Sequence, residues 1–141
     1  VTCVNDGGDH KVSSFPSSQT LELSRDASSS SPYYSITTPR VQQVARNHLN
    51  CQGINGARLE NTGPHCIGSH WHERWFFGEL SSPALSASGE NVLSPLTLAL
   101  MDDSGWYLVD YRNSKSATFG LGAGCDFVEE PCNFDSKLRC I

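Results

Sequence analysis

The chain has 141 residues, about one domain, with 38% hydrophobic residues, 20 serines, 12 glycines and a formal net charge of −5. No basic run occurs, which argues against nucleic acid and anionic membrane surfaces as partners, and no apolar stretch approaches the ~20 residues that cross a bilayer. The serine and glycine content predicts a loop-rich protein. Because the chain starts at Val1 without a methionine, we expect it to be processed or cut from a longer protein.

The cysteines are even in number and show no CxxC spacing, which argues against a zinc ribbon. The six are Cys3, Cys51, Cys66, Cys125, Cys132 and Cys140. This usage favours disulfides and an oxidising compartment. Free buried thiols in a cytosolic protein are the alternative.

The first 35 residues are polar and rich in serine, and they are interrupted by turn and loop residues. Within them "QTLELSR" places Leu21 and Leu23 on one face, which predicts a short strand. Residues 28–31 are a run of serines of low complexity.

A first helix is predicted over about residues 39–50, with Thr38 as a candidate cap and Pro39 in the first turn. Its apolar stripe follows helical spacing and consists of Val41, Val44, Ala45, His48 and Leu49. A histidine on such a stripe is more often a satisfied core residue than a metal ligand, so we interpret His48 as structural.

A second helix is predicted over about residues 94–104, capped by Ser94 and ended by Gly105. Its stripe is broad, so we expect this helix to be the most buried element and to pack beneath the His70 segment. Residues 54–71 are rich in glycine and predict a loop, and "WYLVDY", residues 106–111, predicts a short strand. The fold class expected is therefore α+β, with two main helices and a few short strands.

The stretch "IGSHWHERWFFGELSSP" places His70 and His72 two residues apart. Side chains two apart on a strand share a face, so both imidazoles could bind one metal. Zinc needs three or four ligands, and the further candidates are Glu73, Glu79, His65 and His10. The alternative is a histidine pair without a metal. The chain contains no HExxH, no GxSxG and no phosphate loop.

Five segments, taken in order, resemble the leishmanolysin family of metzincin-type zinc endopeptidases. They are "TTPRVQQVARNHLNC", "LEN", "GSHWHERWFFGELSSP", "LSPLTLALMDDSGWYLVDY" and "FGLGAGCDFVEEPC". The resemblance covers roughly residues 36–132. It implies that residues 36–141 are a disulfide-stapled C-terminal subdomain of a metzincin-like catalytic domain. Residues 1–35 then correspond to the variable segment that follows the family's active-site helix.

The resemblance also implies a site. In this family an upstream HExxH helix supplies two zinc-binding histidines and the glutamate that serves as base, and His70 matches the third histidine. His72 falls at a variable position and is not expected to bind the metal. Glu79 matches the acidic residue before the methionine turn, and Ser81 stands where the family has methionine. The resemblance implies one zinc ion shared with an upstream HExxH-bearing fragment of the same precursor, which would be the partner of this chain.

The expected function is therefore part of an extracellular or cell-surface endopeptidase that acts on protein or peptide substrates. The resemblance further implies a disulfide between Cys51 and Cys125, which would close a loop of about 75 residues worth on the order of 4 kcal/mol. Cys3–Cys66 and Cys132–Cys140 are then plausible pairs. The alternative function is a family-derived structural or adhesive protein without catalysis, which Ser81 and the lack of HExxH favour. An unrelated secreted binding module with a small His70–His72 metal site remains a third reading.

Overall fold

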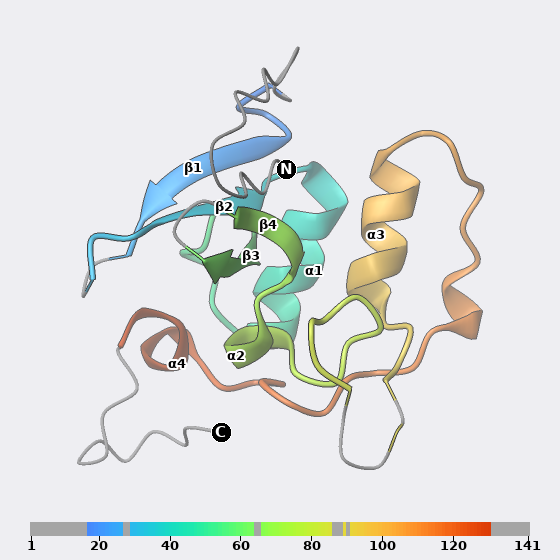
Figure 1. Cartoon of the computed structure of the whole chain (residues 1–141). Helices are drawn as coiled ribbons and strands as arrows, with labels where there is room; N and C mark the ends of the chain where they lie inside the picture. The colour runs from blue at the N-terminus through green and yellow to red at the C-terminus, as the bar shows by residue number, and fades with distance from the viewer. Residues whose placement is uncertain (1–16, 27–28, 64–65, 86–88, 90, 131–141) are drawn as a thin grey trace.

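A four-stranded antiparallel sheet forms one side of the molecule. The computed structural model describes residues 17–26, 29–63, 66–85, 89 and 91–130. The strands follow one another in space as in sequence: β1 (Leu21–Arg25), β2 (Pro32–Ile36), β3 (Ala57–Gly63) and β4 (Cys66–Trp71) (Figure 1). The predicted strand in "QTLELSR" is confirmed as β1.

Two main helices complete the fold, α1 (Pro39–Leu49) and α3 (Pro95–Asp103). In Figure 1, α1 lies between the sheet and α3. Three shorter helical elements are also present: α2 (Glu73–Phe76), the 3-10 turn η1 (Tyr111–Asn113) and α4 (Cys125–Glu129). Both predicted main helices are confirmed at nearly the predicted bounds, and so is the mixture of helix and strand.

The loop predicted over residues 54–71 is wrong, because this segment forms β3 and β4. β3 pairs with β2 in an antiparallel arrangement, with Ser35 opposite Arg58 and Ile36 opposite Ala57. Gly56 permits that close approach, since a Cβ atom at this position would collide with the Ile36 carbonyl. The glycines that suggested a loop therefore allow a close approach of the backbones at the start of β3. They also accompany the irregular pairing between β3 and β4.

The strand predicted in "WYLVDY" is also wrong. Residues 107–110 have no regular structure, and Tyr111 begins the 3-10 turn η1. Trp106 is 86% exposed and Leu108 is fully exposed. Within the described ranges this segment pairs with no strand, so its strand-forming side chains have nothing to pack against.

The core lies between α1, α3 and the C-terminal end of β4. Val41, Ala45 and Leu49 are completely buried on one face of α1. Four of the nine residues of α3 are buried, against three of eleven in α1 and two of four in the short α2, so α3 is the more buried of the two main helices but not the most buried element. Leu100 is only partly buried and packs against the edge of this core.

Thr38 and Ser94 both occupy the predicted N-cap positions, but only Ser94 makes a side-chain capping bond. Ser94 accepts a hydrogen bond from the backbone N–H of Leu96, as predicted for the N-cap of α3, and Gly105 has a φ of 71° just beyond its end. The Thr38 side chain makes no capping bond to α1. The backbone N–H groups of Arg40 and Val41 instead donate to Asp103 Oδ2, at 2.8 and 3.1 Å.

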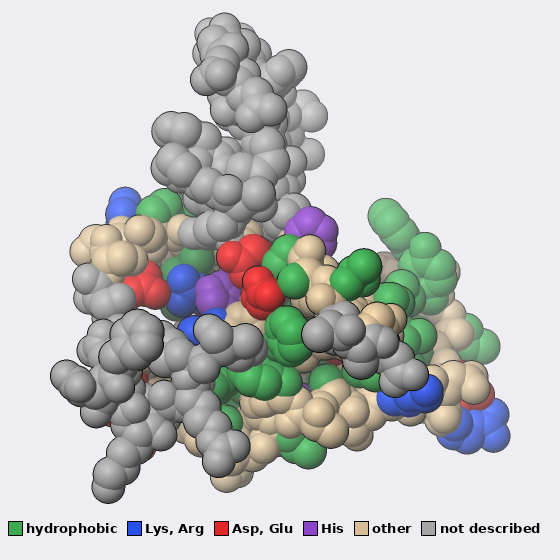
Figure 2. Space-filling view, turned by 60° about the horizontal axis from the view of Figure 1, so that its bottom comes forward, with side chains coloured by type: hydrophobic (Ala, Val, Ile, Leu, Met, Phe, Trp, Pro, Cys, Tyr) green, Lys and Arg blue, Asp and Glu red, His purple; other side chains and the backbone are tan. Residues whose placement is uncertain are grey.

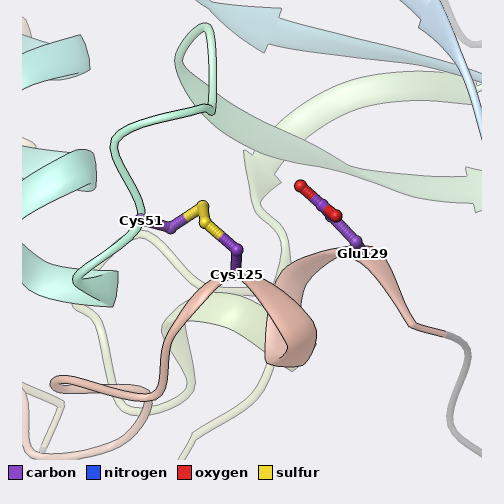
Figure 3. A group of neighbouring side chains, drawn as sticks. All are labelled: Cys51, Cys125 and Glu129. Carbon is purple, nitrogen blue, oxygen red and sulfur yellow. A yellow bond between two sulfur atoms is a disulfide. The ribbon is translucent and has the colours of Figure 1, made fainter.

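A disulfide joins Cys51, just after α1, to Cys125 at the start of α4, as the family resemblance implied (Figure 3). Glu129 lies beside it, and these three are the only described group of three potential metal ligands. Both sulfurs are committed to each other, so the group is not a metal site. The suggested Cys3–Cys66 and Cys132–Cys140 pairs lie outside the residues whose side chains are described.

Candidate functional site

His70 lies near the end of β4 with an exposed side chain. The next residue, Trp71, anchors this strand end to the segment that follows α2. Its backbone N–H donates to the Ser81 carbonyl oxygen at 3.0 Å. Ser81 therefore lies directly beside Trp71, the residue that follows His70.

A buried relay of hydrogen bonds holds the same two segments together from below. The indole Nε1–H of Trp71 donates to Thr97 Oγ1 at 2.9 Å, and the Thr97 hydroxyl donates to Glu79 Oε2 at 2.7 Å. All three side chains are at least 96% buried. Trp71, on β4, and Glu79, two residues before Ser81, are thus joined through a residue of α3.

Glu79 is an acid in an environment that disfavours its charge. Burial raises the pKa of Glu79 to about 7, although the Thr97 hydroxyl and the backbone amides of Leu80 and Ser94 act in the opposite direction. Only the Thr97 bond has hydrogen-bond geometry, and Oε1 is buried without a hydrogen-bond partner. Glu79 therefore takes up a proton near neutral pH, which sets it apart from an ordinary surface glutamate.

His72 faces a different environment from His70. It precedes α2, its backbone N–H donates to the Arg58 carbonyl oxygen at 3.0 Å, and its ring lies against Trp75 with 6.0 Å between ring centres. Burial, with the nearby Arg58 and Arg74 charges, lowers the pKa of His72 to about 4. His72 is therefore neutral at physiological pH and is held by the fold, whereas the His70 side chain is exposed.

The other sequence candidates do not gather around His70. Among the described residues no group of three or more metal-ligating side chains includes it. Glu73 belongs to α2 and its backbone N–H donates to Glu60, while His65 and His10 lie outside the described residues. The described part thus supplies one imidazole, which fits one position of a histidine-based zinc site and leaves the others to be supplied from elsewhere.

His48 is satisfied inside the fold, in agreement with its structural interpretation. Its Nε2 lies 2.8 Å from the Phe119 carbonyl oxygen, and burial lowers the pKa of its imidazole. The Trp71–Thr97–Glu79 relay was missed by the sequence reasoning. A possible signal was Thr97, a polar residue among the apolar side chains of α3, because a buried hydroxyl needs a hydrogen-bond partner.

Comparison with known proteins identifies the family of this chain. The sequence model of the family described as leishmanolysin matches residues 14–138. The chain belongs to the leishmanolysin family of metallopeptidases. It is 39% identical over 98 residues to a leishmanolysin-like peptidase of Drosophila melanogaster, covering 69% of this chain and 14% of that protein. It is 40% identical over 92 residues to the ciliated left-right organizer metallopeptidase of Xenopus laevis, covering 64% of this chain and 13% of that protein.

A leishmanolysin homolog of Crithidia fasciculata is 32% identical over 105 residues, covering 74% of this chain and 16% of that protein. The chain thus spans about one seventh of the length of the curated family members it matches. None of the helices described here is long and apolar enough to cross a membrane.

Proposed function

We propose that this chain is part of a zinc-dependent endopeptidase of the leishmanolysin type and that His70 is its third zinc-binding histidine. The observation that carries the proposal is the 3.0 Å hydrogen bond from Trp71 N to Ser81 O. It joins Ser81, the proposed methionine-turn position, to Trp71, the residue that follows His70, and this supports the proposal. The other two histidines and the glutamate base would come from an HExxH-bearing segment of the same precursor, and the substrate would be a protein or peptide outside the cell or at its surface.

In this proposal the chain's own residues position one ligand. The Trp71 backbone and the buried relay through Thr97 to Glu79 fix the end of β4 relative to the Ser81 turn. His70 can then present its imidazole at a defined place, which lowers the entropy lost on binding a metal. Zinc, when bound, would supply Lewis-acid chemistry at the scissile carbonyl and its water.

The experiment combines this chain with the HExxH-bearing segment of its precursor and measures bound zinc and peptide cleavage. We expect about one zinc per complex and cleavage that is lost on chelation. His70→Ala should abolish both zinc binding and cleavage, and His72→Ala should leave both largely intact. A thermal melt of each variant checks that the complex is still folded. Loss of zinc in His72→Ala alone would show that the ligand assignment is wrong.

The second candidate function is a catalytically inactive scaffold or adhesion protein derived from the same family. Ser81 favours it, because a hydroxyl replaces the thioether that the family packs beneath its metal. Zinc bound at full occupancy with no cleavage of any peptide in a random library would support this candidate over the peptidase. Restoring the methionine with Ser81→Met would then test whether this one position explains the missing activity.

A further inference from the structure

A polar cavity of about 440 Å³ lies away from His70, between the first three strands of the sheet and helices α2 and α4. Four acidic and three basic side chains line it: Glu22, Asp26, Glu129 and Glu130, and Arg25, Arg58 and Arg74. Figure 2 shows basic, acidic and histidine side chains gathered on one part of the molecular surface. The two arginines of β3 and α2 distinguish this cavity from an ordinary charged surface.

Arg58 is a largely buried cation with unused donors. Its side chain is 14% exposed, and its Nη1 donates to Asp26 Oδ2 at 3.0 Å. Its guanidinium carbon lies 4.1 Å from the centre of the Tyr33 ring, which fixes the plane of the group. Nε is buried without a hydrogen-bond partner, and Nη2 makes no hydrogen bond to any described residue.

The charge of Arg74 is less well compensated than that of Arg58. Its Nη2 donates to the backbone carbonyl of Glu130 at 2.7 Å, and its guanidinium lies 5.3 Å from the centre of the Phe127 ring. In the part of the chain that the structure describes, Arg74 has no carboxylate partner, and its Nη1 makes no hydrogen bond. Burial and the nearby Arg58 charge lower the pKa of Arg74, which is the signature of a cation that lacks an anion.

Trp75 adds a further unmatched donor to the same wall. It is 5% exposed, and its indole Nε1–H is buried without an acceptor. The Arg58 guanidinium carbon lies 5.9 Å from the centre of the Trp75 ring. Two guanidinium groups and an indole N–H without an acceptor therefore share one cavity wall, and Asp26 is the only carboxylate bonded to it among the described residues. Buried donors without acceptors are rare in folded proteins, so the two guanidinium groups of this wall are under-compensated, and Arg58 Nη2 and Arg74 Nη1 are the donors left for a ligand in the cavity.

We propose that this cavity is a binding site for a ligand carboxylate, which Arg58 Nη2 and Arg74 Nη1 bind from the inner wall. A carboxylate offers two oxygens with about four lone-pair positions, enough to bridge two guanidinium groups. Glu22, Glu129 and Glu130, which also line the cavity, oppose a dianion such as phosphate more strongly than a singly charged carboxylate. The carboxylate could come from an acidic side chain of a bound peptide, and the inference does not depend on zinc or on peptidase activity.

The test uses the 141-residue chain labelled with ¹⁵N, observed by NMR at its arginine and tryptophan side-chain N–H groups. Acetyl-glutamate amide should shift the Arg58, Arg74 and Trp75 signals in a saturable way. Acetyl-glutamine amide, which has the same shape and no charge, should bind about tenfold more weakly or worse. Inorganic phosphate should also bind more weakly than the glutamate compound. The exposed Trp106 indole serves as an internal control and should not move.

Arg74→Gln should weaken binding of acetyl-glutamate amide at least tenfold, and Arg74→Lys should have an intermediate effect because it keeps the charge and loses the planar fork. Arg112→Gln is the matched control, since Arg112 is exposed and pairs with Asp110 outside the cavity. Unchanged Trp106 and backbone spectra would show that each variant is folded. Equal binding of the glutamine compound, tighter binding of phosphate, or no effect of Arg74→Lys and Arg74→Gln would each overturn the proposal.

Discussion

Two apolar parts of this molecule differ in their exposure to solvent. Leu49, at the end of α1, is completely buried, and it belongs to a core that also contains Phe76. Leu108, in the segment after α3, is fully exposed, and its neighbours Trp106 and Tyr107 are 86% and 57% exposed. Figure 2 shows hydrophobic side chains projecting at the right-hand edge, the edge where the segment after α3 lies in Figure 1.

The difference shows that hydrophobic composition predicts burial only where a partner surface exists. Leu49 lies on the apolar stripe of α1 and belongs to a core cluster that also contains residues of β3, α2, α3 and α4. Residues 106–110 have the composition of a strand, yet a strand is stabilised by cross-strand pairs and same-face packing, and the described residues provide neither here. An exposed apolar segment of this kind is typical of a surface that contacts something else.

This contrast in burial is tested by truncating one leucine in each of the two regions. Leu49→Ala removes buried methyl groups from a closely packed site and should lower the free energy of unfolding by about 3–5 kcal/mol. Leu108→Ala should change it by less than about 0.5 kcal/mol. Urea unfolding followed by circular dichroism measures both. A loss of more than about 1 kcal/mol in Leu108→Ala would show that the segment is packed in solution.

Ionisable groups give a second test of burial, and Glu79 and His72 should show effects of similar size and opposite sign on stability. Its pKa rises from 4.5 to about 7 on folding, so the ionised form destabilises the fold. The penalty is absent below about pH 4.5, grows between pH 4.5 and 7, and reaches on the order of 3 kcal/mol above that. Glu79→Gln should therefore become progressively more stable than the unchanged protein as pH rises, as measured by urea unfolding at each pH.

His72 acts in the opposite sense, so it is the necessary control. Its pKa falls from 6.5 to about 4 on folding, so stability is lost as pH falls through that interval. The two effects oppose each other between about pH 4.5 and 6.5, and the unchanged protein alone does not separate them. Glu79→Gln should expose the loss at low pH, and His72→Gln should expose the loss at high pH. A difference between Glu79→Gln and the unchanged protein that does not vary with pH would contradict the assignment.

Local signals explain which parts of the fold were predictable. Pro39, Ser94 and Gly105 act on their own few residues, and the two main helices were found from them and from the apolar stripes. β3 and β4 were not found, because their glycines and irregular register resemble a loop until β2 is placed beside them. Strand formation here depends on contacts between distant residues, which no short window contains.

The candidate site also has a part that could be predicted from the sequence and a part that could not. His70, Ser81 and the Cys51–Cys125 pair came from motif resemblance; the structure joins the two cysteines and bonds Ser81 to Trp71, the residue after His70, and the metal-ligand role of His70 stays a prediction. The Thr97–Glu79 bond joins α3 to the segment after α2, and the Arg58–Arg74 wall joins β3 to α2. Both depend on how separate elements pack, so neither could be read from the sequence.

The start of α1 allows a smaller comparison, between the buried carboxylate of Asp103 and the surface carboxylate of Asp110. Asp103 comes from α3, its side chain is 3% exposed, and it accepts hydrogen bonds from the first two backbone N–H groups of α1. Burial alone would raise the pKa of Asp103, but the Thr38 hydroxyl and the hydrogen bonds from Val41 and Arg40 outweigh it and lower the pKa overall. Its charge therefore stabilises the fold at neutral pH, and this contribution is lost as pH falls below the usual aspartate range.

Asp103→Ala should lower the free energy of unfolding by about 1–2 kcal/mol, because it leaves two N–H groups at the start of α1 without an acceptor. Asp103→Asn should lose less, since it keeps one acceptor oxygen and removes only the charge. Asp110→Asn is the matched control, because Asp110 also accepts from a backbone N–H, that of Arg112, and lies on the surface. It should have no measurable effect. If Asp103→Ala is equally silent, α1 is held by its apolar stripe alone, and the bonds from α3 to its first turn contribute nothing to stability.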